Sequence, residues 1–481
     1  MKYFIISLFI FCTLVFPSCK KEFLDVPDKS VLLRQAYVTD LKSTGEFLSG
    51  IYVELALYFY QGFNVVYGDL VADNLKPVAG TTTLINHYNW AQKADNDLRP
   101  NPTLSINMNP LWSNGYRIIG SCDFLIEEVD KYRSDDQEKA DDIKGQAYAI
   151  RALIHSVLVN VFAQPYCYTA DASHLGIIYK TSSKYNDPVL RYSVGEVYAK
   201  MIDDLNTAIG LLPDNPKTVT DANKKLVVSR IAAKALLARI YLFKGDYSAA
   251  KNLAAEVGKA IPIMSIANYP AKLFTNQETE ALFQLPPALN GVTGSAGNYN
   301  ALYAGGYFVS PTKRYVATND LVAMLRQNTL DKRSAWVAAD GTVSKYPTNI
   351  LTGSLARHAY YQTILRSSEM YLTAAEAYVN LNNNDSARYY LDAVRKRANP
   401  SAPDITATGT ELLDSICNER RKEFAFEGTR MFDLLRWKKG VARTDAQSST
   451  SQNLPFPSNK AIAPIPTSDV DINGLQQNLD Y

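Results

Sequence analysis

The sequence predicts a mostly α-helical protein in which helix pairs stack on one another and two long irregular insertions interrupt them. Two observations support this fold class. From Trp112 onward, apolar residues recur at spacings of three and four, which is the period of one helix face. Residues 62–110 and 266–363 lack that period and are rich in turn-forming and aromatic residues instead.

A short apolar segment opens the chain. Lys2 precedes an apolar run from Phe4 to Phe16, and Ser18-Cys19 follows soon after it. The run is shorter than the ~20 residues that a membrane-spanning helix needs, so we interpret residues 1–18 as a secretory signal peptide. Cys19 stands where a bacterial lipobox places its lipidated cysteine. We therefore predict lipidation of Cys19; the alternative is an ordinary signal peptide followed by an incidental cysteine.

Composition excludes some classes of partner. The net charge is +2, which gives no reason to expect nucleic acid as a ligand. Tyrosine is abundant, with 31 residues against 18 phenylalanines, and its flat ring with a polar tip suits sugar rings and wet interfaces. Three cysteines remain beyond Cys19, an odd number without metal-binding spacing, so we expect no disulfide scaffold.

The clearest helix pair lies between residues 229 and 262. Ile231, Ala235, Ala238 and Leu242 follow one helix face, and Gly245-Asp246-Tyr247 then breaks the helix before a second one begins. Small residues on the facing sides let two antiparallel helices approach closely. This is the tetratricopeptide pattern.

Weaker copies of this pair flank it, and such pairs stack because each covers the apolar face of the next. The copies are expected at residues 118–129 with 143–162, at 197–213, and at 364–381 with 386–398. The predicted organisation is a signal peptide (1–18), an N-terminal anchor and first helix (19–61), a loop insertion (62–110), a tetratricopeptide-like helical region (111–265), an irregular insertion (266–363), a C-terminal helical region (364–440) and a C-terminal packing segment (441–481).

The stretch from Glu419 to Trp437 has two parts joined at Gly428. We predict a turn there, because glycine accepts a positive φ without a Cβ clash. Arginine side chains on both sides of this turn are expected to bind nearby carboxylates such as Glu423 and Asp433. The arginines are Arg420, Arg421, Arg430 and Arg436.

Four blocks of this sequence, in this order, resemble the SusD/RagB family, the outer-membrane nutrient-binding lipoproteins of Bacteroidetes. They are Cys19-Lys20-Lys21-Glu22-Phe23-Leu24-Asp25, residues 145–153, residues 366–377 and residues 419–437. The resemblance implies that the two insertions interweave into a second subdomain, packed on the helices, whose exposed aromatic residues bind the ligand.

Residues that would carry catalysis or hold a metal are not arranged for it. The four histidines are scattered and form no HExxH or zinc set, and no G-x-S-x-G elbow occurs. Adjacent acids such as Glu127-Glu128 lie on or near helices, where neighbours point about 100° apart, unlike the facing carboxylates of glycosidases. We therefore expect a protein that is not an enzyme and that has no cofactor or zinc site. Asp95-Asn96-Asp97 could hold calcium but lacks the rest of an EF-hand loop, so calcium binding stays open.

Ligand binding by stacking needs flat side chains together with a few polar groups. The first candidate is Trp90, which follows Tyr88 and Asn89, and its polar partner could be Asn89, Asn86 or Lys76. The alternative for Trp90 is that it anchors its loop to the core. Further candidates come from the second insertion, and for each of them a core position is the competing interpretation. These are Tyr303, Tyr307 and Trp336.

The resemblance implies a lipoprotein at the outer membrane that faces the cell exterior. Such a protein captures a nutrient oligomer, most often a glycan, and passes it to a SusC-like TonB-dependent channel. Two alternatives stay open at this point. One is an oligopeptide-binding protein of the RagB type, and the other is a tetratricopeptide scaffold of the envelope that binds another protein.

Overall fold

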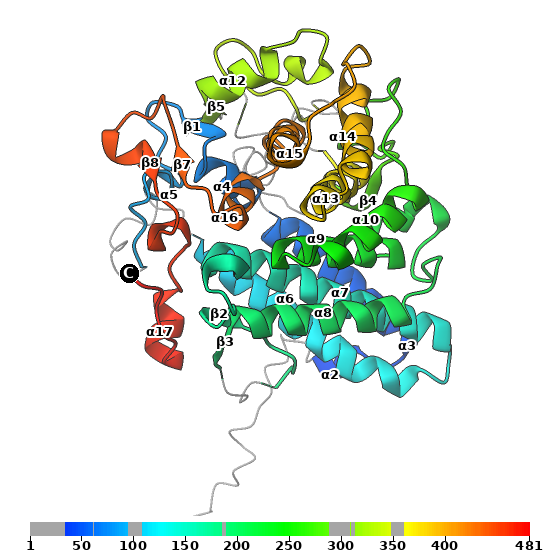
Figure 1. The fold of residues 1–481 in the computed structure, drawn as a ribbon. Helices are drawn as coiled ribbons and strands as arrows, with labels where there is room; N and C mark the ends of the chain where they lie inside the picture. The colour runs from blue at the N-terminus through cyan, green and yellow to red at the C-terminus, as the bar shows by residue number, and fades with distance from the viewer. Residues whose placement is uncertain are drawn as a thin grey trace, which may run out of the picture.

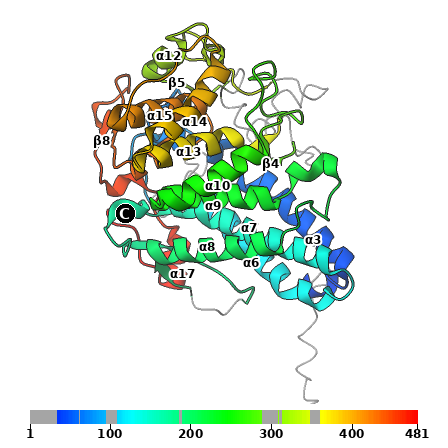
Figure 2. The same cartoon turned by 45° about the vertical axis from the view of Figure 1, so that its right-hand side comes forward.

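Helices stacked in layers make up most of the chain, as the sequence predicts (Figures 1 and 2). The computed structural model describes residues 34–60, 62–94, 108–184, 189–287, 308, 313–347 and 360–481. The predicted signal peptide, Cys19, residues 95–97, Tyr303 and Tyr307 lie outside the described residues.

Each helix of the stack packs on the next one along the chain, from α6 through α10 and on to α13, α14 and α15. Figure 2 shows these helices as successive layers. Their bounds are α3 Leu41–Glu54, α6 Asn109–Glu128, α7 Gln137–Phe162, α8 Val194–Leu211, α9 Arg230–Lys244, α10 Tyr247–Ala260, α13 Ser367–Asn380, α14 Asn384–Ala398 and α15 Gly409–Glu423.

The α9–α10 pair forms where the sequence predicts it, and its ends explain why. The Ser229 side chain accepts a hydrogen bond from the Ala232 N–H and caps α9. Gly245 ends that helix with φ of 84°, in the left-handed region. The Asp246 side chain then caps α10 by accepting from the Ala249 N–H. Buried alanines along α9 let the two helices approach closely.

The predicted insertions contain more regular structure than expected. Residues 62–110 include the helices α4 Gly62–Leu70 and α5 Ile85–Tyr88 and the strand β1 Leu75–Pro77. Residues 266–363 include β4 Ala281–Leu285, β5 Tyr315–Ala317 and α12 Asn319–Arg326. Strands β1 and β5 pair antiparallel, with Lys76 opposite Val316, so the two insertions interweave.

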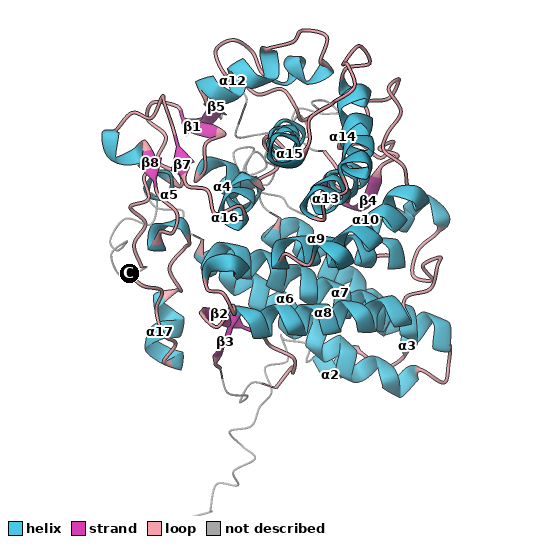
Figure 3. Ribbon diagram, viewed as in Figure 1, coloured by secondary structure: helices cyan, strands magenta, loops and turns pink. Residues whose placement is uncertain are grey.

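The remaining strands are short and lie beside the helical stack (Figure 3). Strand β6 Gln362–Arg366 pairs with β4. Because residues 364–366 belong to this strand, α13 begins later than the predicted residue 364. The other elements are α2 Arg34–Tyr37, a π-helix Leu55–Phe59, β2 Leu175–Ile178, β3 Arg191–Ser193, α16 Arg430–Arg436, β7 Val441–Ala442, β8 Asn453–Leu454 and α17 Thr467–Asn473, with 3₁₀ turns at Val129–Tyr132, Tyr166–Tyr168, Asp221–Leu226, Lys332–Trp336, Ser449–Ser451 and Asn459–Ala461.

The chain turns at Gly428, with φ of 76°, as predicted, and the turn sits directly on α4. The Gly428 N–H donates to Asp69 Oδ2 at 2.8 Å. Arg420 binds Asp433 across the turn, at 3.3 Å, as expected. Arg421 and Arg430 do not; both bind Asp73, which follows α4 in the first insertion. The stretch from Glu419 to Trp437 therefore binds the first insertion, residues 62–110, to the helical stack.

Glu423 lies at the centre of a buried charge cluster that the sequence pattern did not reveal. Its Oε1 accepts from Arg366 and from Arg397, each at 2.6 Å, and its Oε2 accepts from Arg333 at 3.2 Å. Burial alone would raise the pKa of Glu423, but Arg397, Arg366 and Arg333 outweigh burial and hold that pKa well below its usual range. We expected Glu423 to pair locally, across the Gly428 turn; its partners come instead from three distant segments.

The C-terminal residues pack against the end of α7. Asn478 Nδ2 donates to the carbonyl oxygens of Phe162 and Ala463, both at 2.8 Å. The Tyr481 hydroxyl donates to the Ile462 carbonyl oxygen at 2.8 Å. These bonds fix the last residues of the chain to the helical stack.

Candidate ligand-binding site

Trp90, the first predicted ligand contact, lies inside the protein. Only 7 % of its surface is exposed, and its indole N–H donates to the Val71 carbonyl oxygen at 3.0 Å. The Arg443 guanidinium lies 4.1 Å from the centre of the Trp90 ring and 4.0 Å from that of Tyr88, which is also buried. This corrects the predicted stacking role of both rings, because protein groups occupy the positions that a sugar would need.

Arg443 explains why these rings turn inward. Its guanidinium donates to the carbonyl oxygens of Ala72 at 2.6 Å, Tyr88 at 2.6 Å and Val71 at 2.8 Å. Burial lowers the pKa of Arg443 to about 10, so the side chain still carries its charge at neutral pH. A buried cation that binds several carbonyls of one loop fixes that loop, and the two rings cover it.

The other described candidates divide between two places. Asn89 lies between Tyr88 and Trp90, the two residues whose rings cover Arg443, and its Oδ1 accepts a hydrogen bond from the Ser451 hydroxyl at 2.7 Å. Lys76 lies nearer the surface, and its Nζ donates to Asp445 Oδ2 at 2.7 Å and to Asn319 Oδ1 at 3.0 Å.

Trp336 belongs to a separate cluster in the second insertion. It is buried, with the Lys345 ammonium 4.2 Å from its ring centre and Tyr269 edge-on at 6.2 Å between ring centres. The expectation of an exposed platform is therefore wrong for Trp336 as well, because Lys345 and Tyr269 cover it. The roles predicted for Tyr303 and Tyr307 stay predictions.

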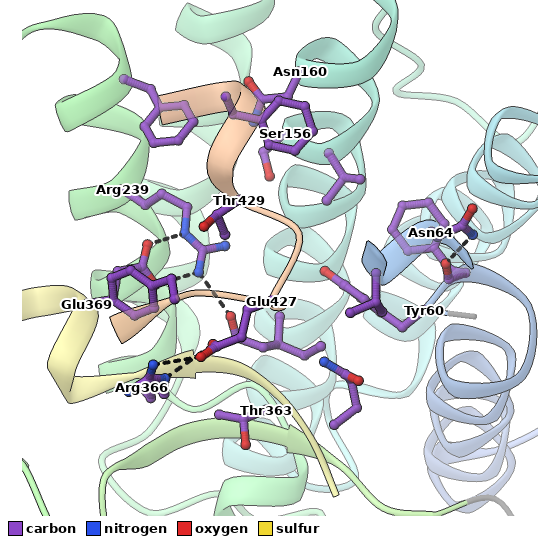
Figure 4. A pocket seen from close by; sticks show the side chains of 18 of the residues that line it. Tyr60, Asn64, Ser156, Asn160, Arg239, Thr363, Arg366, Glu369, Glu427 and Thr429 are labelled. Atoms are coloured by element: carbon purple, nitrogen blue, oxygen red, sulfur yellow. Dashed lines mark hydrogen bonds and ion pairs between the residues drawn. The ribbon is translucent and has the colours of Figure 1, made fainter. Parts of the chain in front are cut away.

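A cavity of about 140 Å³ lies where the helical stack meets the second subdomain (Figure 4). Six segments distant in sequence form its wall, and half-buried residues such as Tyr60, Asn64 and Phe243 connect it to the surface. The lining residues are Phe59, Tyr60, Asn64, Val65, Leu111, Ser156, Val157, Asn160, Arg239, Phe243, Gln362, Thr363, Ile364, Arg366, Glu369, Arg420, Phe424, Glu427, Thr429 and Phe432.

Four of the five charged residues of the cavity wall are paired within the wall. Arg239 binds Glu369 through two parallel hydrogen bonds, of 2.5 and 2.6 Å. Burial would lower the pKa of Arg239, but Glu369 outweighs burial and raises that pKa above its ordinary value. Arg366 Nη2 donates to Glu427 Oε1 at 2.7 Å. The fifth charged residue, Arg420, binds Asp433 outside the wall, so each arginine of the wall faces a carboxylate.

Two buried polar atoms of the wall have no hydrogen-bond partner among the described residues. One is Asn64 Oδ1, and the other is Arg420 Nη1. Asn64 uses its Nδ2 to donate to the Phe59 carbonyl oxygen, at 2.7 Å. Arg420 uses Nε and Nη2 for Asp433, at 3.4 and 3.3 Å. Since buried polar groups are nearly always satisfied, both atoms mark places where a further partner fits.

Sequence reasoning missed this cavity. Two of its segments, near residues 366 and 420–432, were singled out, but as family blocks and not as a wall. The nearest signal was the number of arginines in those blocks.

Among the described residues, no group of His, Cys, Asp and Glu could hold a metal ion, and no helix is long and apolar enough to cross a membrane.

Two family models match this chain and together cover most of it. One is described as the SusD family and matches residues 342–481. The other is described as starch-binding, associating with the outer membrane, and matches residues 23–242. The chain belongs to the SusD family. Proteins of the SusD family are binding proteins associated with the outer membrane.

Relatives within the SusD family share the whole fold. A SusD-like protein of Formosa agariphila is 22 % identical, over 90 % of this chain and 89 % of its own. The structure of a SusD superfamily protein from Bacteroides thetaiotaomicron is similar with a TM-score of 0.79, at 24 % identity, covering 92 % of this chain and all of that one. A laminarin-binding SusD-like protein is similar with a TM-score of 0.68, at 22 % identity and with coverage of 92 % and 100 %.

Proposed function

We propose that this protein is a lipid-anchored lipoprotein on the outer face of the outer membrane that captures a glycan oligomer. It passes the glycan to a SusC-like TonB-dependent channel and breaks no bond in doing so. The observation that carries the proposal is the match of residues 23–242 to the starch-binding, outer-membrane family model. The laminarin-binding protein of similar fold supports the same ligand class.

The glycan is expected to contact the surface of the second subdomain near Lys76. The side chain of Lys76, one of the predicted contacts, is 25 % exposed. It holds a position between Asp445 and Asn319, and all three can hydrogen-bond to hydroxyl groups. Fixed polar groups of this kind orient a sugar that aromatic side chains of neighbouring loops stack upon.

Calorimetric titration of the chain from Lys20 onward tests this function. We expect binding of laminarin or starch oligosaccharides, and a loss of roughly tenfold in affinity for Lys76→Ala, since one charge-assisted hydrogen bond contributes about 1.5 kcal/mol or more. Lys259→Ala, at an exposed lysine of α10, is the matched control and should bind as the wild type does. Binding of oligopeptides without oligosaccharides would contradict the glycan proposal and favour the RagB-type alternative.

Membrane attachment through Cys19 gives a second test. Cys19→Ala should move the protein from the outer-membrane fraction to the soluble fraction, because acyl chains contribute about 0.8 kcal/mol for each buried CH₂ group. Wild-type protein should instead be extracted from the membrane together with a TonB-dependent channel. A Cys19→Ala protein that stays in the membrane fraction would rule out the lipid anchor. Cys122→Ala, at a buried cysteine of α6, is a control that leaves the anchor intact.

A further inference from the structure

We propose that the cavity of Figure 4 is a binding site for a small neutral polyhydroxylated molecule of about six non-hydrogen atoms, with glycerol as the test ligand. This site is distinct from the surface near Lys76 and does not depend on the glycan proposal. Its size, its unpartnered polar atoms, its charge balance and its aromatic walls each restrict the ligand.

Size sets the upper limit. The cavity has a volume of about 140 Å³. A protein cavity of about 150 Å³ is known to hold benzene, which has six non-hydrogen atoms. A molecule of three or four carbons with its hydroxyl groups therefore fits inside, whereas a whole oligosaccharide does not.

The unpartnered atoms require both a donor and an acceptor on the ligand. Asn64 Oδ1 can only accept a hydrogen bond, and Arg420 Nη1 can only donate one. A hydroxyl group does both, so a ligand hydroxyl can serve either atom. Ser156, whose hydroxyl already donates to the Leu153 carbonyl oxygen at 2.7 Å, offers a further acceptor in the same wall.

Charge balance excludes an ionised ligand. The wall carries Arg239, Arg366 and Arg420, but each of them already faces a carboxylate, respectively on Glu369, Glu427 and Asp433. A ligand carboxylate would gain only the unpartnered Nη1 of Arg420, and it would be desolvated close to Glu369 and Glu427, the two acids of the wall. A neutral polyol meets no such cost.

Aromatic rings supply the rest of the wall. The C–H faces of a polyol pack on such rings while its hydroxyls point to the polar side, as in other mixed small-molecule sites. The rings belong to Phe59, Tyr60, Phe243, Phe424 and Phe432. They lie in or next to the π-helix, α9, α15 and α16, so a bound polyol contacts several elements that are distant in sequence.

Equilibrium dialysis of the full-length protein in detergent against radiolabelled glycerol tests the site. We expect saturable binding of one glycerol per chain. Asn64→Leu should weaken it about tenfold, since the leucine removes the acceptor at nearly the same volume. Val157→Phe should abolish binding by filling the cavity from α7. Val53→Phe, the same change at a valine of α3 that is 53 % exposed, is the matched control and should bind normally.

The outcomes separate this site from the proposed function. Each variant is first checked for wild-type helical circular dichroism. The proposal is overturned if glycerol binding is not saturable, if Val157→Phe binds as well as Val53→Phe, or if lactate, the charged analogue, binds more tightly than glycerol. Titration of Val157→Phe with laminarin should still give wild-type affinity. The laminarin titration thus tests the proposed glycan function, and the glycerol dialysis tests the cavity site separately.

Discussion

Gly428→Ala is expected to lose at least about 4 kcal/mol of unfolding free energy, enough to prevent folding of a typical domain. Two effects add. Gly428 has φ of 76°, which strains any residue with a Cβ atom. A Cβ built there would also lie 1.7 Å from the Val65 carbonyl oxygen of α4, a backbone atom that cannot rotate away. The turn and α4 would have to separate, and the bond from Gly428 to Asp69 would break.

Gly245→Ala is the matched control for this experiment. Gly245 also has a positive φ, of 84°, but a Cβ there would meet no atom within 4 Å. Gly245→Ala should lower the unfolding free energy by only about 1–2 kcal/mol, which is the strain of the left-handed conformation alone. Urea unfolding followed by circular dichroism measures both variants. If both variants lose the same unfolding free energy, the close approach of α4 to Gly428 does not contribute to the cost of Gly428→Ala.

Glu423→Gln should cost roughly 3–5 kcal/mol, because it removes the shared carboxylate of a buried cluster and leaves its cations unbalanced. Arg366, Arg397 and Arg333 all donate to Glu423, and each is nearly inaccessible to solvent. Glutamine keeps the shape of the side chain but loses the charge and turns one acceptor into a donor that faces these guanidinium groups. The loss is therefore electrostatic and not a matter of volume.

Glu411→Gln provides the comparison, on the same helix α15 and with the same chemical change. Glu411 is exposed, so its substitution should stay within about 0.5 kcal/mol of the wild type. Thermal or urea unfolding of the two variants side by side gives the difference. A loss below about 1 kcal/mol for Glu423→Gln would mean that the cluster relaxes around glutamine, in conflict with the buried geometry.

Local sequence rules predicted the helical stack well. The α9–α10 pair follows from residues close in sequence: a serine cap, an alanine-rich face, and the Gly245-Asp246 turn. Each of these signals acts over a few residues, so it can be recognised from the sequence alone. The turn at Gly428 was predicted on the same basis, from the conformational freedom of one residue.

The orientation of Trp90 depends on a distant residue and could not be predicted in the same way. An aromatic residue among turn formers suits an exposed platform and a buried anchor equally. Arg443 decides between them, and it lies more than 350 residues further along the chain. The partners of Glu423 and the wall of the cavity have the same origin, because segments from residue 59 to residue 432 form them only when they meet.

The attachment of Asp69 and Asp73 to residues 421–430 has a consequence for the order in which the chain acquires its structure. Asp69 is fully buried, and its contact with Gly428 spans 359 positions. During synthesis or export, residues 62–74 emerge long before those partners exist, so the contacts of Asp69 and Asp73 with residues 421–430 cannot yet form. Long-range closure of this kind delays folding until late. Residues 421–430, which follow their partners by 348 to 359 positions, thus complete the first insertion.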